Sequence, residues 1–437
     1  MAQPIEDTVA GGWRRTAGPY FEAAPIASFF LGISSGFPLT LLLSTMTYWL
    51  SKQGIDKKTI GFAIGLTTPY TLKFLWAPLL DRVRLPILTG WFGQRRAWLF
   101  VIQAFLAAAV WNLGASDPVH HIGRFAFWAV ATAFLSATQD IVIDAFRIEI
   151  LSTRQLAFGT AMNQFGYRTG NLLAGAGTVA LFSPEGFGLG WRLAYGLTAL
   201  LVVPGAIAAL AIGPGHRVEQ ATDGRPANWF ATTIAAPFVE FFHRRGAWLI
   251  LAFVLTYKLG DAMGQLMLNP MIVDHGFTDQ EFIAISKLVG FTALIVGSAL
   301  GAPMIARFGI MRSLFASGLI MSFANVMFAL VAASGHSPAM LGLAVGLENL
   351  FAGIGLTVFA TYLAGLSNLA FTATQYALLS SVAAVGRTFI SAPSGYVQAA
   401  IGWPGFYLFA AVVAVPGLLL LWLMQRRGFV VGATEGS

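Results

Sequence analysis

Two carboxylates stand four residues apart inside an apolar stretch of the chain. Asp140 and Asp144 lie in a run that starts near Phe125, with Gln139 beside the first acid and Arg147 three residues after the second. This spacing puts both carboxylates on one face of a helix. A charge near the bilayer centre costs about 2.5–3.5 kcal/mol, so such residues face a cavity or a partner. The pattern predicts a proton or substrate site at Asp140 and, for Asp144, either a proton relay or a structural ion pair with Arg147.

A second pair of opposite charges interrupts a later apolar stretch. Lys258 and Asp261 are three residues apart, roughly half-way through that stretch, and share a helical face. One interpretation is a self-neutralising ion pair. The alternative is a substrate-binding lysine beside a titrating carboxylate, which makes Asp261 the second candidate for the proton after Asp140.

Three more charged residues within apolar stretches need partners. Arg168 lies within one or two helical turns of the depth of Asp140, so we expect these two to pair. Glu348, next to Asn349, is expected to pair with Arg387 across a helix interface. From their polarity and depth, we expect Gln139, Lys258 and Asn349 to line a central cavity and to hydrogen-bond a substrate.

The composition is that of an integral membrane protein. The 437 residues are 57% hydrophobic and only 10% charged, with a mean hydropathy of +0.71. A soluble domain carries about 25% charged residues. The net charge of +7 comes from basic residues scattered over short loops, which fits membrane topology and gives no reason to expect a nucleic-acid partner.

Enzymatic and cofactor-binding patterns are weak. The chain has no cysteine, and its six histidines are scattered in or next to loops without the spacing of metal ligands. No glycine-rich phosphate loop follows a strand. We therefore expect no metal, no cofactor and no enzymatic activity, and transport driven by an ion gradient or by the gradient of the substrate.

Twelve apolar stretches are each long enough to cross a hydrocarbon core of about 30 Å as a helix. Sixteen of the 26 Lys and Arg residues fall on one side of the resulting topology and five on the other. The positive-inside rule then predicts that both termini are cytoplasmic. The stretches are 23–50, 59–80, 97–115, 123–149, 154–182, 191–213, 246–272, 281–306, 312–333, 338–366, 372–399 and 404–425.

The longest interruption divides the chain into two parts. We expect a six-helix half over 1–213, a cytoplasmic linker over 214–245 and a second six-helix half over 246–437. Within the linker, bulky apolar residues at helical spacing predict a short helix on the membrane surface, bent at Pro237. These residues are Trp229, Phe230, Thr233, Ile234, Phe238, Phe241 and Phe242.

The two halves repeat each other. The segment 77–82, APLLDR, recurs at 302–307 as APMIAR, and Arg168-Thr169 recurs as Arg387-Thr388. Two parallel six-helix halves with a site at midplane between them are the design of the major facilitator transporters. The repeat places alanines opposite Asp140 and Asp144, so the scaffold itself does not require the acid pair.

The loop after the second stretch resembles the cytoplasmic signature of that superfamily. Asp81-Arg82 is followed by Gly93-Gln94-Arg95-Arg96, and a shorter version in the second half keeps Arg307 and Arg312 but has Ala306 in place of the acid. We expect these residues to form a conformational latch, in which a carboxylate pairs with basic residues and helix ends in one transport state. Simple positive-inside anchoring is the alternative, but it does not explain Asp81.

Several sequence blocks together resemble the AmpG-type muropeptide permeases from about Phe29 to Leu421. The blocks include 73–82, 136–144, 166–168, 257–262, 348–350 and 373–380. By motif match, Gly36, Ala137 and Gln139 fall on positions associated with function in that family. From the matching blocks we add Tyr257 and Gln375 as expected substrate contacts.

The resemblance implies proton-coupled import of N-acetylglucosaminyl-anhydro-N-acetylmuramyl peptides across the inner membrane of Gram-negative bacteria, for cell-wall recycling. In some species the imported fragments also signal β-lactamase induction. We expect substrate, protons and membrane lipid as partners and a monomer as the working unit. Two alternatives remain: a carrier of the same fold for acetyl-CoA or a siderophore-like molecule, and a membrane-embedded glycosyltransferase. The short periplasmic loops argue against the glycosyltransferase.

Overall fold

The computed structural model describes residues 17–56, 62–215 and 234–428, and the described part is built of helices. The first half runs from α2 to α13, with short 3-10 and π-helical segments (η) between some of the helices. Its helices are α2 (Ala23–Thr40), α3 (Met46–Lys52), α5 (Thr68–Leu72), α6 (Ala77–Arg82), α7 (Leu88–Phe92), α8 (Gln94–Gly114), α9 (Ile122–Ile150), α10 (Leu156–Leu172), α11 (Thr178–Phe182), α12 (Gly190–Ala199) and α13 (Val203–Ile212).

The second half follows the linker helix α14 (Ala236–His243). Its last span is separated from the one before by a kink at Gly402, where φ is 71°. The helices are α15 (Ala247–Thr256), α16 (Leu259–Asp274), α17 (Asp279–Phe282), α18 (Phe291–Phe308), α19 (Ile310–Ser334), α20 (Pro338–Leu366), α21 (Thr372–Val385), α22 (Ser394–Val413) and α23 (Val415–Arg426).

Within the described residues, nine helical segments are long and apolar enough to cross a membrane. Three predicted spans are not among them. The second is broken into η3 (Phe62–Thr67), α5, η4 (Lys73–Leu75) and α6. The fifth and eleventh are continuous helical runs, which include the π-helical segments η5 (Leu173–Gly177) and η9 (Gly386–Ile390), but they are less apolar than the nine. The all-helical membrane fold is confirmed, whereas the count of twelve spans and the side on which the termini lie stay predictions.

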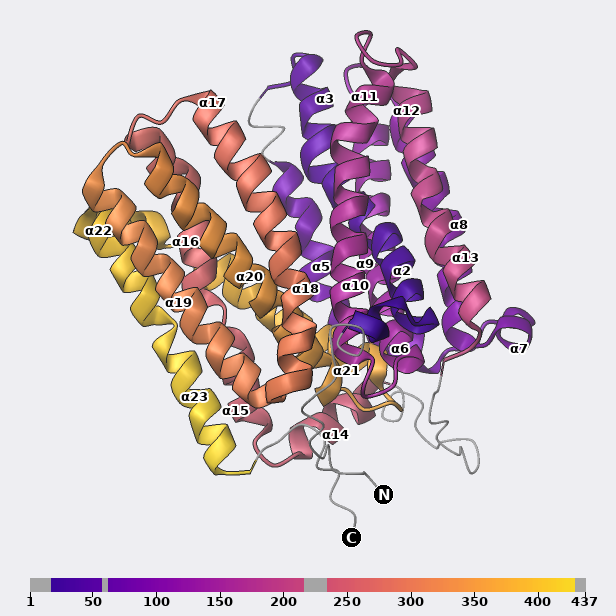
Figure 1. Ribbon diagram of the computed structural model, residues 1–437. Helices are drawn as coiled ribbons and strands as arrows, with labels where there is room; N and C mark the ends of the chain where they lie inside the picture. The colour runs from indigo at the N-terminus through magenta and orange to yellow at the C-terminus, as the bar shows by residue number, and fades with distance from the viewer. Residues whose placement is uncertain (1–16, 57–61, 216–233, 429–437) are drawn as a thin grey trace.

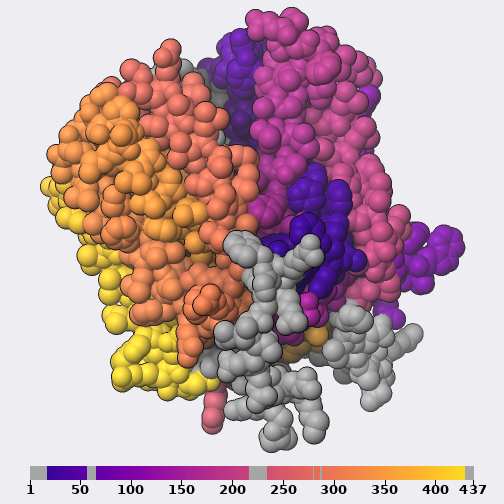
Figure 2. All heavy atoms as spheres, viewed as in Figure 1, coloured from indigo at the N-terminus to yellow at the C-terminus, as the bar shows by residue number. Residues whose placement is uncertain are grey.

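The two parts of the chain stand side by side and meet at one end (Figure 1). There α21 packs on α6 and α9, and α10 packs on α18. We call this the arginine-rich end, because Arg82, Arg95, Arg154 and Arg244 lie there. At the opposite end, Figure 2 shows a notch between the salmon α17–α18 region and the magenta α11 region.

Glycines let α2 and α10 cross with their backbones in contact. A Cβ atom placed on Gly166 would lie 1.8 Å from the Phe29 carbonyl oxygen, and one on Gly36 would lie 2.2 Å from the Tyr167 carbonyl oxygen. Small residues permit such close approach between membrane helices. Gly36 is therefore a packing residue here, and the expected substrate contact at Gly36 is not supported, because α10 covers it.

We expect Gly166→Ala to destabilise the protein by about 1–3 kcal/mol or more, because the methyl group collides with backbone that has no room to move. Gly123→Ala is the matched control, since a Cβ on this helical glycine of α9 meets nothing within 4 Å. Thermal unfolding of the purified variants in detergent measures the difference. Equal melting temperatures for the two variants would contradict the close crossing.

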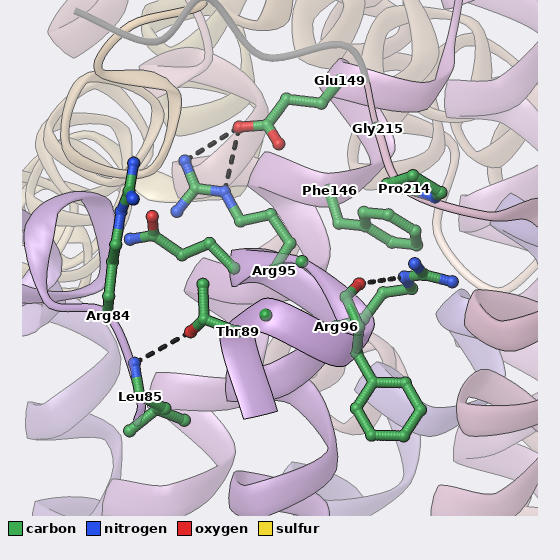
Figure 3. Close-up of a pocket in the computed structure, with 13 residues that line it drawn as sticks. Arg84, Leu85, Thr89, Arg95, Arg96, Phe146, Glu149, Pro214 and Gly215 are labelled. Carbon is green, nitrogen blue, oxygen red and sulfur yellow. Dashed lines mark hydrogen bonds and ion pairs between the residues drawn. The ribbon is translucent and has the colours of Figure 1, made fainter. Parts of the chain in front are cut away.

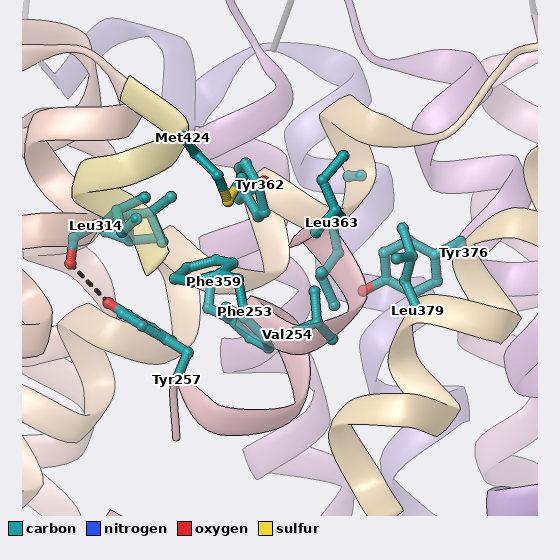
Figure 4. Close-up of a cluster of buried hydrophobic side chains, with 14 of the residues drawn as sticks. Phe253, Val254, Tyr257, Leu314, Phe359, Tyr362, Leu363, Tyr376, Leu379 and Met424 are labelled. Carbon is teal, nitrogen blue, oxygen red and sulfur yellow. Dashed lines mark hydrogen bonds between the residues drawn. The ribbon is translucent and has the colours of Figure 1, made fainter. Parts of the chain in front are cut away.

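The core of the second half surrounds Tyr257, in the two-residue break between α15 and α16 (Figure 4). The Tyr257 ring stacks on Phe359, and its hydroxyl donates to the Leu314 carbonyl oxygen at 2.8 Å. Tyr257 is only 3% exposed. The expected substrate contact at Tyr257 is therefore not supported, because both its ring and its hydroxyl are used in packing α15 against α19 and α20.

The linker contains the predicted short helix, α14, with Pro237 in its first turn. This helix directly follows the π-helical residues Ile234 and Ala235, so the missing N–H of Pro237 falls at the join of the two segments. The predicted bend at Pro237 stays a prediction. Phe241 at the end of this helix is fully buried. The predicted residues Trp229, Phe230 and Thr233 lie outside the described part of the chain.

Candidate functional site

A cluster of charged side chains lies inside the first half, on the face of α9 that carries both acids. Asp140 accepts a hydrogen bond of 2.5 Å from the Ser35 hydroxyl of α2. Asp144 lies 3.8 Å from Lys73 Nζ and 3.3 Å from an Arg147 nitrogen. Lys73 also acts electrostatically on Asp140. The cluster is thus two carboxylates that share one lysine, with Arg147 at its edge.

The predicted ion pair between Asp144 and Arg147 is present, and it also connects the two halves. Arg147 is 1% exposed and donates to the Thr160 hydroxyl at 2.7 Å and to the Tyr376 hydroxyl at 3.3 Å. Tyr376 belongs to α21 of the second half. A change in the charge of Asp144 therefore alters the position of Arg147 and, through it, the contact between Arg147 and Tyr376 that joins the halves.

The predicted pair between Asp140 and Arg168 is not formed. Arg168 has no ion pair in the described part of the chain and lines a groove on the side of the bundle with Phe165 and Phe291. The two residues lie at similar depth, but Arg168 is rotated away from Asp140 on α10. Lys73, which lies on the broken second span, supplies the positive charge instead.

A second cluster lies in the other half. Lys258 Nζ is 3.6 Å from Asp261, as the spacing predicts, and their side chains are 24% and 12% exposed. Glu348 accepts hydrogen bonds from Gln265 at 2.6 Å and from Asn349 at 2.8 Å. Glu348, Asp261 and Lys258 also interact electrostatically, so this cluster again combines two acids with one lysine.

The expected pair between Glu348 and Arg387 is absent from the described ion pairs. Glu348 is bonded within its own half, whereas Arg387 in η9 is exposed and close enough to Arg168 for the two positive charges to repel. The error has the same cause as for Arg168: sequence gives the depth of a residue on a helix but not the direction in which it points.

The remaining expected substrate contacts divide into half-buried and buried positions. Lys258 and Asn349 are half-buried beside the second cluster. Gln139 and Ala137 are fully buried, and the Gln139 amide donates to the Ser34 carbonyl oxygen at 2.6 Å. Gln139 and Ala137 therefore pack α9 against α2 here, and neither is open to a substrate in this conformation.

The contacts expected of the latch residue Asp81 are present at the arginine-rich end, whereas its role as a conformational latch stays a prediction. Asp81 lies 2.6 Å from an Arg95 nitrogen. It also accepts hydrogen bonds from the backbone nitrogens of Ala373 and Thr374, at 3.2 and 2.8 Å, and from the Thr374 hydroxyl at 2.6 Å. These residues begin α21, where a carboxylate is favoured by the helix dipole and by free N–H groups. Asp81 thus joins the first half to the second.

Glu149 is a second acidic partner of Arg95, and we did not predict it from the sequence. Its carboxylate lies 2.8 Å from Arg95, and both side chains are almost fully buried. Arg95 therefore lies between two acids, Asp81 in the last turn of α6 and Glu149 at the end of α9. An acidic residue at the end of a span beside an arginine-rich loop is the signal that would have identified it.

The other arginines expected in the latch have different surroundings. Arg82 lies over the Phe371 ring, 5.7 Å from its centre. Arg96 donates to the Phe92 carbonyl oxygen. Arg307 and Arg312 are exposed and form no ion pair in the part of the second half that the structure describes. The second-half version therefore has no ion pair that corresponds to Asp81–Arg95 among its described residues, because Ala306 provides no carboxylate.

Gln375 is bound to the linker helix. It is fully buried, its amide nitrogen donates to Glu240 of α14, and its amide oxygen accepts from Arg244 at 2.9 Å. Arg244 in turn donates to Glu240 and to the Leu366 carbonyl oxygen. The expected substrate contact at Gln375 is therefore not supported, because its amide joins the first turn of α21 to α14.

The fold and the charged clusters inside it are those of a multi-pass membrane transporter. The model of the Major Facilitator Superfamily matches residues 28–347. Among solved structures, the Escherichia coli fucose:proton symporter has a TM-score of 0.64 at 15% identity, covering 92% of this chain and 98% of that one. The human organic anion transporter MFSD10 has a TM-score of 0.62 at 15% identity, covering 94% and 100%.

Curated relatives are similar over nearly the whole chain. The anhydromuropeptide permease of Escherichia coli K12 is 37% identical over 91% of this chain and 78% of its own length. The putative transporter AmpG 4 of Rickettsia conorii is 32% identical over 91% of this chain and 96% of its own. The chain belongs to the Major Facilitator Superfamily and, within it, to the AmpG-type permeases.

Proposed function

We propose that this protein imports N-acetylglucosaminyl-anhydro-N-acetylmuramyl peptides from periplasm to cytoplasm in symport with protons, as a monomer in the bacterial inner membrane. Cell-wall recycling is then its physiological role, and signalling of β-lactamase induction a consequence of it. The observation that carries the substrate assignment is the similarity to the anhydromuropeptide permease over 91% of this chain.

Proton coupling is supported by the shared lysine of the first cluster. Two acids that compete for one cation change their partners when either acid is protonated. Asp144 is connected through Arg147 to Tyr376 of the second half, so a proton on Asp140 alters a contact that holds the halves together. Asp261 remains the second candidate, because it shares Lys258 with Glu348 in the same manner.

The Asp81 contacts at the arginine-rich end account for the change of conformation in the transport cycle. In the predicted orientation the arginine-rich end faces the cytoplasm, so the Asp81 contacts close the cytoplasmic side of the cavity. Substrate enters from the periplasm, and release of Asp81 from the start of α21 opens the path inward. The half-buried Lys258 and Asn349 are the substrate contacts that this arrangement retains from the sequence-based expectations.

Uptake of radiolabelled anhydromuropeptide into right-side-out and inverted vesicles tests the substrate and the direction. We expect concentrative uptake only in right-side-out vesicles with an inward proton gradient, and competition by unlabelled anhydromuropeptide. Competition by acetyl-CoA or by a siderophore, without competition by anhydromuropeptide, would assign the protein to another substrate.

Lys73→Met is expected to reduce proton-driven uptake by about ten- to a hundredfold. The variant leaves two carboxylates without their lysine, and an uncompensated buried charge costs about 1.5–3 kcal/mol. Arg168→Met is the matched control, because it removes a positive charge at similar depth that has no ion pair in the described part of the chain. Initial rates per inserted protein measure both. If Arg168→Met lost its dependence on the proton gradient and Lys73→Met did not, Arg168 would be the partner of Asp140, as the sequence predicted.

A further inference from the structure

A cavity of about 550 Å³ opens at the arginine-rich end of the first half, beside the latch (Figure 3). It lies between the segment from α6 to the start of α8, the end of α9 and the residues that follow α13. Its polar lining consists of Arg84, Thr89, Gln94, Arg95, Arg96 and Glu149.

The lining is positively charged. Glu149 is the one acid among the described residues that line it, and it pairs with Arg95, which also binds Asp81. Arg96 donates its Nε to the Phe92 carbonyl oxygen at 2.5 Å, and its two terminal nitrogens make no hydrogen bond within the described part of the chain. These two Arg96 nitrogens, together with the positive charge that Arg84 adds to the lining, favour a ligand with several anionic oxygens, such as a phosphate.

An apolar surface lies next to the cavity, outside its lining and facing away from the bundle. It belongs to α7 and the residue before it, and α7 projects sideways beyond the end of α8 in Figure 1. Ile87 and Trp91 are 70% and 74% exposed there. Tryptophan at this level of a membrane protein is typical of the boundary between headgroups and acyl chains.

The backbone turn before α7 contains one strained residue. Ile87 has φ of 65°, a conformation that a β-branched residue rarely adopts and that persists only where the surroundings impose it. The Thr89 hydroxyl accepts from the Leu85 backbone nitrogen at 2.9 Å, and the Thr89 nitrogen donates to the Leu85 oxygen at 3.1 Å. These bonds close the turn that presents Ile87 on the outside while Arg84 stays in the cavity lining.

We propose that this cavity binds the headgroup phosphate of an anionic phospholipid, whose acyl chains lie against Ile87 and Trp91. Basic pockets on the cytoplasmic side of membrane proteins bind such headgroups. Free inorganic phosphate shares the headgroup chemistry, but it has no apolar part that could pack against Ile87 and Trp91. We therefore assign the lipid as the ligand.

Native mass spectrometry of the full-length protein with phosphatidylglycerol tests the proposal. At about 1 kcal/mol for each arginine near the surface, Arg84→Gln/Arg96→Gln should bind phosphatidylglycerol about thirtyfold more weakly. Arg307→Gln/Arg312→Gln is the matched control, because it removes two exposed arginines from the corresponding loop, which is shorter and has no counterpart of α7. The control should bind phosphatidylglycerol like the unsubstituted protein.

Two further arms identify the source of the phosphate. Trp91→Ser keeps every charge, so weaker phosphatidylglycerol binding in this variant supports a lipid seated on α7. Titration with inorganic phosphate should leave bound phosphatidylglycerol in place. Equal losses in the two arginine variants, unchanged binding in Trp91→Ser, or displacement of the lipid by millimolar phosphate would each overturn the proposal.

Discussion

Asp140→Asn should abolish accumulation of anhydromuropeptide above its external concentration while sparing substrate binding and exchange. Asparagine keeps an oxygen that accepts from Ser35, but it carries neither a charge for Lys73 nor a removable proton. The variant therefore resembles the protonated carboxyl at every pH. Because residue 140 can then no longer bind and release a proton, the proton gradient cannot drive transport through it. Concentrative uptake and counterflow of labelled for unlabelled substrate, measured in the same vesicles, separate the two activities.

Asp117→Asn is the matched control for that prediction. Asp117 lies in the loop between α8 and α9, where hydrogen bonds from the backbone and side chain of His120 and from the Val119 nitrogen lower its pKa to about 2. It stays ionised at any physiological pH, so removing it changes charge without removing a titrating group. Accumulation by Asp140→Asn that equals that of Asp117→Asn would sink the assignment and make Asp261 the leading candidate.

Asp81→Asn should shift the protein away from the state closed at the arginine-rich end. The substitution removes a charge-assisted contact to Arg95 and weakens the bonds to the start of α21, for which about 1–3 kcal/mol is expected. This corresponds to a population shift of about five- to a hundred-and-fiftyfold. Single cysteines introduced at each end of this naturally cysteine-free chain report the change through their labelling rates.

Thr374→Ala provides the graded comparison for the latch. It removes one hydroxyl donor to Asp81 but leaves both backbone nitrogens and Arg95 in place. Its effect should be about 1 kcal/mol, smaller than that of Asp81→Asn. Identical labelling in Asp81→Asn and the unsubstituted protein would show that the contact does not hold this state.

Interactions between near neighbours on one helix could be predicted from the sequence. Asp144 with Arg147, and Lys258 with Asp261, are each three residues apart, and helical geometry alone brings them together. The Asp81–Arg95 ion pair was predictable for another reason: its motif resembles a superfamily signature, and a carboxylate next to an arginine-rich loop is expected to pair with one of the arginines around it.

Contacts between helices were harder to predict, because they depend on rotation about the helix axis. Arg168 has the depth of Asp140 but points into a side groove, while Lys73 reaches the acids from a span that is broken into short pieces. No periodic pattern marks those breaks in advance. Gly36 and Gln375 show a related limit. The motif match picked out these two positions, but it could not distinguish a residue that packs helices together from one that contacts the substrate.

Proton movement on substrate addition tests the central claim most directly. Purified protein in liposomes with a trapped pH-sensitive dye is given anhydromuropeptide on the side that corresponds to the periplasm, with no gradient imposed. Symport predicts acidification of the lumen as substrate enters, and none for Asp140→Asn. Entry of labelled substrate into liposomes of the unsubstituted protein without any pH change would contradict proton coupling.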